Sequence, residues 1–74
     1  MNDRITINAD VLGGKPIIAG TRISVEFVVG LLAQGWTEDD VLKEYDHITH
    51  DDIQACLIYA HQLLTDEKLY PIPV

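Results

Sequence analysis

The stretch from Gly14 to Arg22, Gly-Lys-Pro-Ile-Ile-Ala-Gly-Thr-Arg, constrains this chain more than any other, because no ordinary helix or strand requires that order of residues. Glycines near both ends permit the positive φ of tight turns, and Pro16 fixes φ and removes a hydrogen-bond donor. The β-branched pair Ile17 and Ile18 favours a short strand between the turns. We therefore predict turn, strand and turn, with a turn motif made of Gly14, Lys15, Pro16, Gly20 and Thr21.

A second strand is predicted before this stretch. Arg4 to Ile7 alternates with β-branched residues, and a pairing with residues 16–19 would give a small hairpin-like ribbon. Pro16 restricts the second strand to a strand start or a sheet edge. A two-stranded ribbon is marginal alone, so it must pack on helices or on another chain.

The first predicted helix runs from Val25 to Ala33, with Ser24 as its N-cap and Gly35 as its stop. Apolar residues cover most of its circumference, so most of its surface should be buried. Two alternatives remain for what buries this helix: a second copy or partner, or the N-terminal ribbon.

Two more helices are predicted, from Thr37 to Tyr45 and from about His50 to Leu64, each with a threonine cap and acids in the first turn. In the longer helix, Ile58 lies apart from the apolar stripe and is either a stray surface residue or part of a contact patch. The stripe itself recurs at the spacing of one helical face and predicts the core side: Ile53, Cys56, Leu57, Ala60, Leu63 and Leu64.

With 74 residues the chain makes one domain. It divides into a β and turn arm (1–23), a three-helix core (24–64) and an extended tail (65–74), and the fold class is mainly α. The tail ends in an apolar strip, Tyr70-Pro71-Ile72-Pro73-Val74, whose alternate prolines exclude a helix. We expect the strip to dock, as an added strand or an apolar strap on a second chain.

Composition indicates a globular, soluble, cytoplasmic protein. Hydrophobic residues make up 47% of the chain, and the lone Cys56 cannot form an internal disulfide, so it reads as a small core hydrophobe. The longest apolar run, residues 27–33, is far shorter than the roughly 20 residues that a membrane span requires. No secretory signal opens the sequence.

The formal charge of −7 lies entirely in residues 36–74, which hold nine acids against Lys43 and Lys68. Such a surface repels phosphate backbones, so nucleic acid is disfavoured as a partner of that half. If DNA is contacted at all, the candidate contacts are Arg4, Lys15 and Arg22 in the neutral N-terminal half.

Recognisable catalytic chemistry is absent from the sequence. Gly13-Gly14-Lys15 lacks the spacing of a phosphate-binding loop, and one cysteine with scattered histidines does not make a metal site. We therefore expect no enzyme, cofactor or metal. The last two helices have the outline of a helix-turn-helix, but the second opens with His50-Asp51-Asp52 and contains no Arg or Lys, unlike a DNA-reading helix.

Four segments resemble one small bacterial family: residues 14–25, 32–37, 51–53 and 55–60. This family is domain-of-unknown-function family 433, some members of which are regarded as VapB-type antitoxins. The match runs from about Asp10 to His61, and Asp46 departs from it where the family usually has proline. The resemblance implies a homeodomain-like three-helix core with a short N-terminal β element. It also implies pairing with a PIN-like ribonuclease toxin encoded beside it.

Residues and resemblance together predict a non-enzymatic interaction module, an antitoxin that binds and neutralises a PIN-like ribonuclease. The alternative is a stand-alone helix-turn-helix DNA-binding regulator. Because the first helix is so apolar, we also expect a homodimer. Arg22 must pair with a carboxylate or carbonyl in the fold or with a partner, since a helix N-terminus does not favour a cation. The candidate partner-binding residues are Arg22, Ile58, Tyr70, Pro71 and Ile72.

Overall fold

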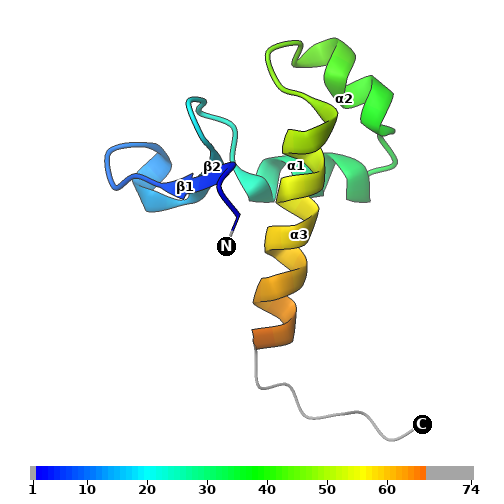
Figure 1. Cartoon of the computed structure of the whole chain (residues 1–74). Coiled ribbons are helices and arrows are strands. Elements are labelled where there is room, and N and C mark those ends of the chain that lie inside the picture. Colours follow the sequence, from blue (N-terminus) through cyan, green and yellow to red (C-terminus); the bar gives the residue numbers. More distant parts are fainter. Residues whose placement is uncertain (1, 67–74) are drawn as a thin grey trace, which may run out of the picture.

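The computed structural model of the chain describes residues 2–66, so the predicted strip Tyr70 to Val74 lies outside the described residues. The elements follow in the order β1 (Ile5–Ile7), the 3-10 turn η1 (Leu12–Gly14), β2 (Pro16–Ile18), α1 (Val25–Ala33), α2 (Glu38–Glu44) and α3 (His50–Asp66). Figure 1 shows the β ribbon to one side of the three helices. The predicted fold class, mainly α with an N-terminal strand pair, is confirmed.

The two strands pair antiparallel, with Thr6 opposite Ile17 and Ile7 opposite Pro16. Pro16 stands at the start of β2, where the missing N–H does least harm. The predicted turns form before and after β2. There Gly14 adopts φ 86° and Gly20 adopts φ 79°, values that L side chains rarely tolerate.

The second turn is held by Thr21. Its Oγ1 donates to the Ile18 carbonyl at 2.8 Å and accepts from the Ile23 N–H at 3.0 Å. The Ile18 N–H donates in turn to the Ile23 carbonyl at 2.9 Å, which closes the outer edge of β2 and leads directly into α1. The turn motif therefore sets where the first helix begins.

Each helix start carries the predicted cap. Ser24 Oγ accepts from the Phe27 N–H at 2.9 Å, and Thr37 forms a reciprocal capping box with Asp40. Thr49 and Asp52 make the same reciprocal pair at the start of α3, at 2.9 and 3.2 Å. These bonds satisfy backbone donors that a helix leaves free.

The core lies where the three helices meet. Its four fully buried side chains come from α1 (Val28), α2 (Val41) and the first half of α3 (Ile53 and Cys56). Cys56 is a core residue, as predicted, and burial, aided by the negative charge of Asp52, raises the pKa of its thiol to about 11. A thiol with so high a pKa is a poor nucleophile at neutral pH.

The cover of α1 comes partly from the ribbon. Val25, Val28 and Leu31 are buried, and β2 packs on this helix beside α2 and α3. Phe27 remains 42% exposed and contacts Tyr45 edge-on, with ring centroids 5.5 Å apart. The ribbon therefore covers only part of α1.

The predicted core stripe of α3 is wrong at Leu57, Leu63 and Leu64, which are 37, 51 and 61% exposed. The reason is length: α1 has nine residues, about 14 Å, whereas α3 has seventeen, about 26 Å, and extends past every neighbour (Figure 1). The helix also ends at Asp66 rather than Leu64, and its last turn is supported by Thr65 Oγ1, which donates to the Gln62 carbonyl at 2.9 Å.

The N-terminal arm is fixed to the first half of α3. Arg4 Nη1 lies 3.0 Å from Asp52 Oδ1, Arg4 Nη2 lies 3.6 Å from Asp51 Oδ2, and Asn2 Nδ2 donates to the Ala55 carbonyl. Burial alone would raise the pKa of Asp52, but hydrogen bonds from Thr49 and Arg4 outweigh it and lower that pKa. The carboxylate thus links the arm to the helix cap.

Replacing this carboxylate should destabilise the fold. Asp52→Ala removes both a cap and the Arg4 partner, and we expect a loss of about 2 kcal/mol at neutral pH in urea unfolding. Asp51→Ala, which removes only the exposed and longer contact, is the matched control and should change little.

The same variant predicts a pH dependence. Because the folded pKa of Asp52 lies below its unfolded value, its contribution is present above about pH 4 and is lost as pH falls through the folded pKa. The difference in unfolding free energy between the wild type and Asp52→Ala should therefore decrease as the pH falls. A difference in unfolding free energy that stays constant down to pH 2 would contradict this role of Asp52.

Candidate protein-binding surface

An open groove of about 340 Å³ lies between α1 and the second half of α3. Small residues of α1 leave room for it, since a Cβ added to Gly30 would meet no atom within 4 Å. The residues that form its apolar wall are Val29, Gly30, Ala33, Tyr59, Ala60 and Leu63. The groove continues the core beyond the point where the helices cover one another.

An apolar stripe runs along α3 beside the groove. Leu57, Ala60 and Leu64 follow one another at intervals of three and four residues, so they share a helix face. Leu64 is the most exposed of the three. Groove and stripe together form one surface, which we call the α3 surface and define by Val29, Gly30, Ala33, Tyr59, Ala60, Leu63, Leu57 and Leu64.

Ile58 lies elsewhere. It is 45% exposed and lines a different open hollow, whose other residues include Asn2, Arg4 and Gln54. None of the residues that line this hollow belongs to the α3 surface, so the structure does not bring Ile58 together with it. Its role in partner binding stays a prediction.

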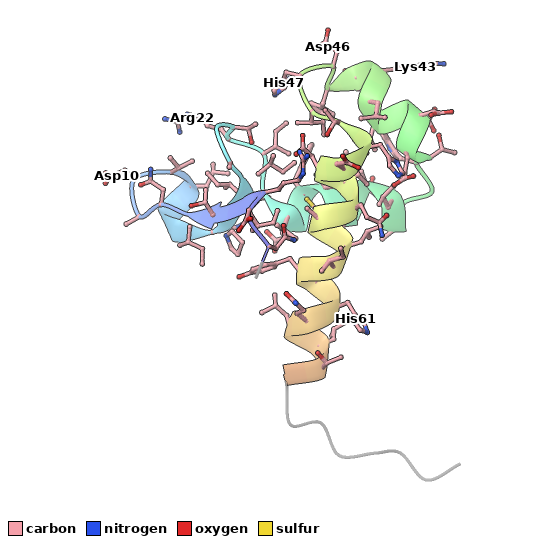
Figure 2. The ribbon with its side chains drawn as sticks, viewed as in Figure 1. Asp10, Arg22, Lys43, Asp46, His47 and His61 are labelled. Atoms are coloured by element: carbon pink, nitrogen blue, oxygen red, sulfur yellow. The ribbon has the colours of Figure 1, made fainter. Side chains whose placement is uncertain are left out.

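Two of the three candidate nucleic-acid contacts are paired within the chain. Arg4 bonds Asp51 and Asp52, and Lys15 Nζ lies 2.7 Å from Glu26 Oε1, a contact that lowers the pKa of Glu26. Arg22 is exposed and has no ion pair or side-chain hydrogen bond within residues 2–66. Figure 2 shows it projecting outward from the turn between β2 and α1.

The helix-turn-helix formed by α2 and α3 presents acids. Glu38, Asp39 and Asp40 occupy the first turn of α2, and Asp51 and Asp52 that of α3. Hydrogen bonds from Thr37 lower the pKa of Asp40, so this carboxylate is fully ionised at neutral pH. The end of α3 that would enter a DNA groove is therefore negative.

No group of three or more His, Cys, Asp and Glu side chains within residues 2–66 is arranged to hold a metal ion. His47, at the turn after α2, and His61, on α3, lie far apart in Figure 2. His50 Nδ1 lies 3.2 Å from Glu38 Oε2, a contact between the starts of α3 and α2. Among the described helices, none is long and apolar enough to cross a membrane.

The groove is not among the sequence-based predictions, which place Leu63 and Leu64 in the core and assign no role to Gly30 or Ala33. The available signal was the difference in predicted length between the first and third helices, because an apolar stripe longer than its neighbours cannot be fully covered by them.

The family model for a protein of unknown function, DUF433, matches residues 5–60. The chain belongs to this family. An uncharacterised protein, y4eO of Sinorhizobium fredii, is 32% identical over 56 residues, which are 76% of this chain and 25% of that protein. A crystal structure of a DUF433 member from Anabaena variabilis has 34% identity and a TM-score of 0.77, over 80% of this chain and 58% of that one.

These comparisons confirm the family resemblance and the fold. The chain spans a quarter of the length of y4eO and a little over half of the Anabaena protein. The matched residues 5–60 include the turn motif and the helical core but stop before Leu63 and Leu64.

Arg22 and its neighbour Thr21 should differ in their effect on stability. Arg22→Ala removes an exposed side chain with no partner in the described fold, and we expect a change below about 0.5 kcal/mol. Thr21→Val removes both turn hydrogen bonds and should cost about 1–2 kcal/mol. Urea unfolding followed by Trp36 fluorescence measures both. An Arg22→Ala loss as large as that of Thr21→Val would mean that Arg22 supports the fold.

Proposed function

We propose that this chain is a non-enzymatic protein-binding module, the antitoxin of a type II toxin-antitoxin pair, and that its α3 surface binds and neutralises a PIN-like ribonuclease. The observation that carries the proposal is the contrast along α3: Leu57, Leu63 and Leu64 are exposed, whereas Ile53, Ala55 and Cys56 of the same helix are buried. Contiguous exposed apolar residues on a small domain mark an interaction site.

The chemistry of the groove favours a protein partner over a small molecule. A small-molecule site needs a few polar groups that converge on the ligand, whereas the groove wall offers apolar side chains with Glu26 as its one charged lining residue. An apolar helix or extended segment of a partner fits such a surface. Glu26, which is exposed and lines the groove, supplies the kind of polar rim that surrounds protein interfaces.

The charge distribution favours a basic partner. Exposed carboxylates at the starts of α2 and α3, such as Asp39, Asp40 and Asp51, lie outside the groove. A ribonuclease must present positive charge to its RNA substrate, so these acids would speed its association with the module. The apolar surface would then supply most of the affinity, which should survive moderate salt.

A stand-alone helix-turn-helix regulator is the second candidate, because α2 and α3 pack as consecutive helices joined by a short turn. Two features weigh against it. Acids occupy the first turn of α3, and Arg4 and Lys15 already pair with carboxylates. Arg22 alone is a weak basis for binding a phosphate backbone.

Leu63 provides the test. Leu63→Asp places a charge in the groove while leaving the core intact, so binding to a purified PIN-like ribonuclease should weaken at least about tenfold. His61→Asp puts the same charge two residues away on the same helix, outside the groove, and should change affinity less than about twofold. Calorimetry at low and moderate salt measures both.

Two results would overturn the proposal. One is equal affinity of Leu63→Asp and His61→Asp for the ribonuclease. The other is tight operator binding by the isolated chain with a steep salt dependence and no ribonuclease binding, which would favour the regulator. An intrinsic turnover that a single side-chain replacement abolishes would indicate an enzyme instead.

A further inference from the structure

β1 has an open backbone edge. The Ala19 N–H donates to the Arg4 carbonyl at 2.8 Å, and Thr6 pairs with Ile17, so the backbone groups of these alternate residues face β2. The backbone groups of Ile5 and Ile7 therefore face away from β2. The Ile5 N–H donates to the Asn2 carbonyl at 3.3 Å, but the Ile5 carbonyl and both backbone groups of Ile7 have no partner among residues 2–66.

An apolar hollow lies beside this edge. It measures about 300 Å³, and its apolar lining residues are Ile5, Ile7 and Tyr59, with Asn2, Thr6 and Gln62 as the polar ones. The Ile7 side chain is 61% exposed. An extended segment added to β1 would therefore gain backbone partners and cover apolar side chains at once.

The sequence contains a segment with the matching pattern, Tyr70-Pro71-Ile72-Pro73-Val74. In an extended strand, alternate residues direct their backbone groups to the same edge and their side chains to the same face. The two prolines remove donors from one edge only. Tyr70, Ile72 and Val74 keep their N–H groups on the other edge, and their apolar side chains share one face.

We propose that Tyr70–Val74 of a second copy adds to β1 as a third strand. With Ile72 opposite Ile7, these two residues exchange both backbone hydrogen bonds, and the Val74 N–H reaches the Ile5 carbonyl. The apolar side chains of the added strand then lie on the face of Ile5 and Ile7, next to Tyr59. The prolines block the new outer edge, so no fourth strand can follow.

The length of the chain between Asp66 and Tyr70 favours a segment from a second copy over the chain's own segment. α3 leads away from the β ribbon (Figure 1), and Asp66 lies four residues beyond Gln62, the last α3 residue at the hollow, about 6 Å along the helix. The four steps from Asp66 to Tyr70 span at most about 14 Å when fully extended. With Ile72 opposite Ile7, Tyr70 falls opposite Ala9, so the remaining length of about 8 Å would have to supply both a reversal and a crossing to the far end of β1. Reciprocal exchange between two copies avoids the reversal and gives a closed two-fold dimer.

Ile72→Pro tests the strand directly, because it removes the central donor and lies outside the described fold. Ile7→Pro removes the facing N–H, which the fold does not use. Ile72→Val keeps both donor and apolar face and is the matched control. Sedimentation equilibrium and amide hydrogen exchange at Ile7 are the two readouts.

We expect the wild type and Ile72→Val to have twice the 8.3 kDa mass of one chain, with Ile7 exchange at least about tenfold slower than in Ile72→Pro. Both proline variants should be monomers with wild-type circular dichroism. If Ile7→Pro fails to fold, Ile72→Pro still decides the question.

Three results would overturn the proposal: a monomer with a protected Ile7 amide, which indicates the chain's own segment; a dimer that persists in Ile72→Pro; and a monomer with an unprotected amide. Leu63→Asp should leave the strand exchange intact, since Leu63 does not line the β1 hollow. Loss of ribonuclease binding and loss of the dimer are thus separate outcomes.

Discussion

The length difference between α1 and α3 determines how this domain is built. Nine residues of α1 can cover only half of a seventeen-residue helix, and the fully buried side chains lie within that half. Ile53 and Cys56 meet Val28 and Val41 in a closed core, whereas the turns that follow Tyr59 border only open hollows, beside α1 through Leu63 and beside β1 through Gln62. The same helix thus serves as the centre of the fold at one end and as an exposed apolar surface at the other.

The charged side chains are distributed according to the same division of α3 into a covered end and an exposed end. The arm reaches the closed end of α3, where Arg4 bonds the capping carboxylate Asp52 and Asn2 bonds the Ala55 carbonyl. This pairing balances the charge of Arg4, although half of its side chain stays exposed, and Glu38, Asp39 and Asp40 keep the helix-turn-helix acidic. Lys15 is paired with Glu26 in the same way. The open end of α3 therefore differs from the rest of the surface in both polarity and charge, and the proposed function uses that contrast to select a partner.

Much of this arrangement could be predicted from local sequence. Ser24, Thr37 and Thr49 marked the helix starts because a cap depends on residues within one turn, and Gly14 and Gly20 marked turns because their φ values are local properties. The exposure of Leu63 and Leu64 could not be read from periodicity, which reports the apolar face of a helix and not what covers it. The pairing of Arg4 with Asp52 joins residues 48 positions apart and needs the fold itself.

The most direct test of a binding role for the groove uses Gly30, on its floor. A Cβ added there would meet no atom within 4 Å, and replacing a glycine inside a helix adds roughly 0.5–1 kcal/mol of stability. Gly30→Leu should therefore fill the groove without disturbing the core. The account predicts a melting temperature equal to or above that of the wild type, together with at least about tenfold weaker binding of the ribonuclease. Full affinity with the groove filled would contradict it.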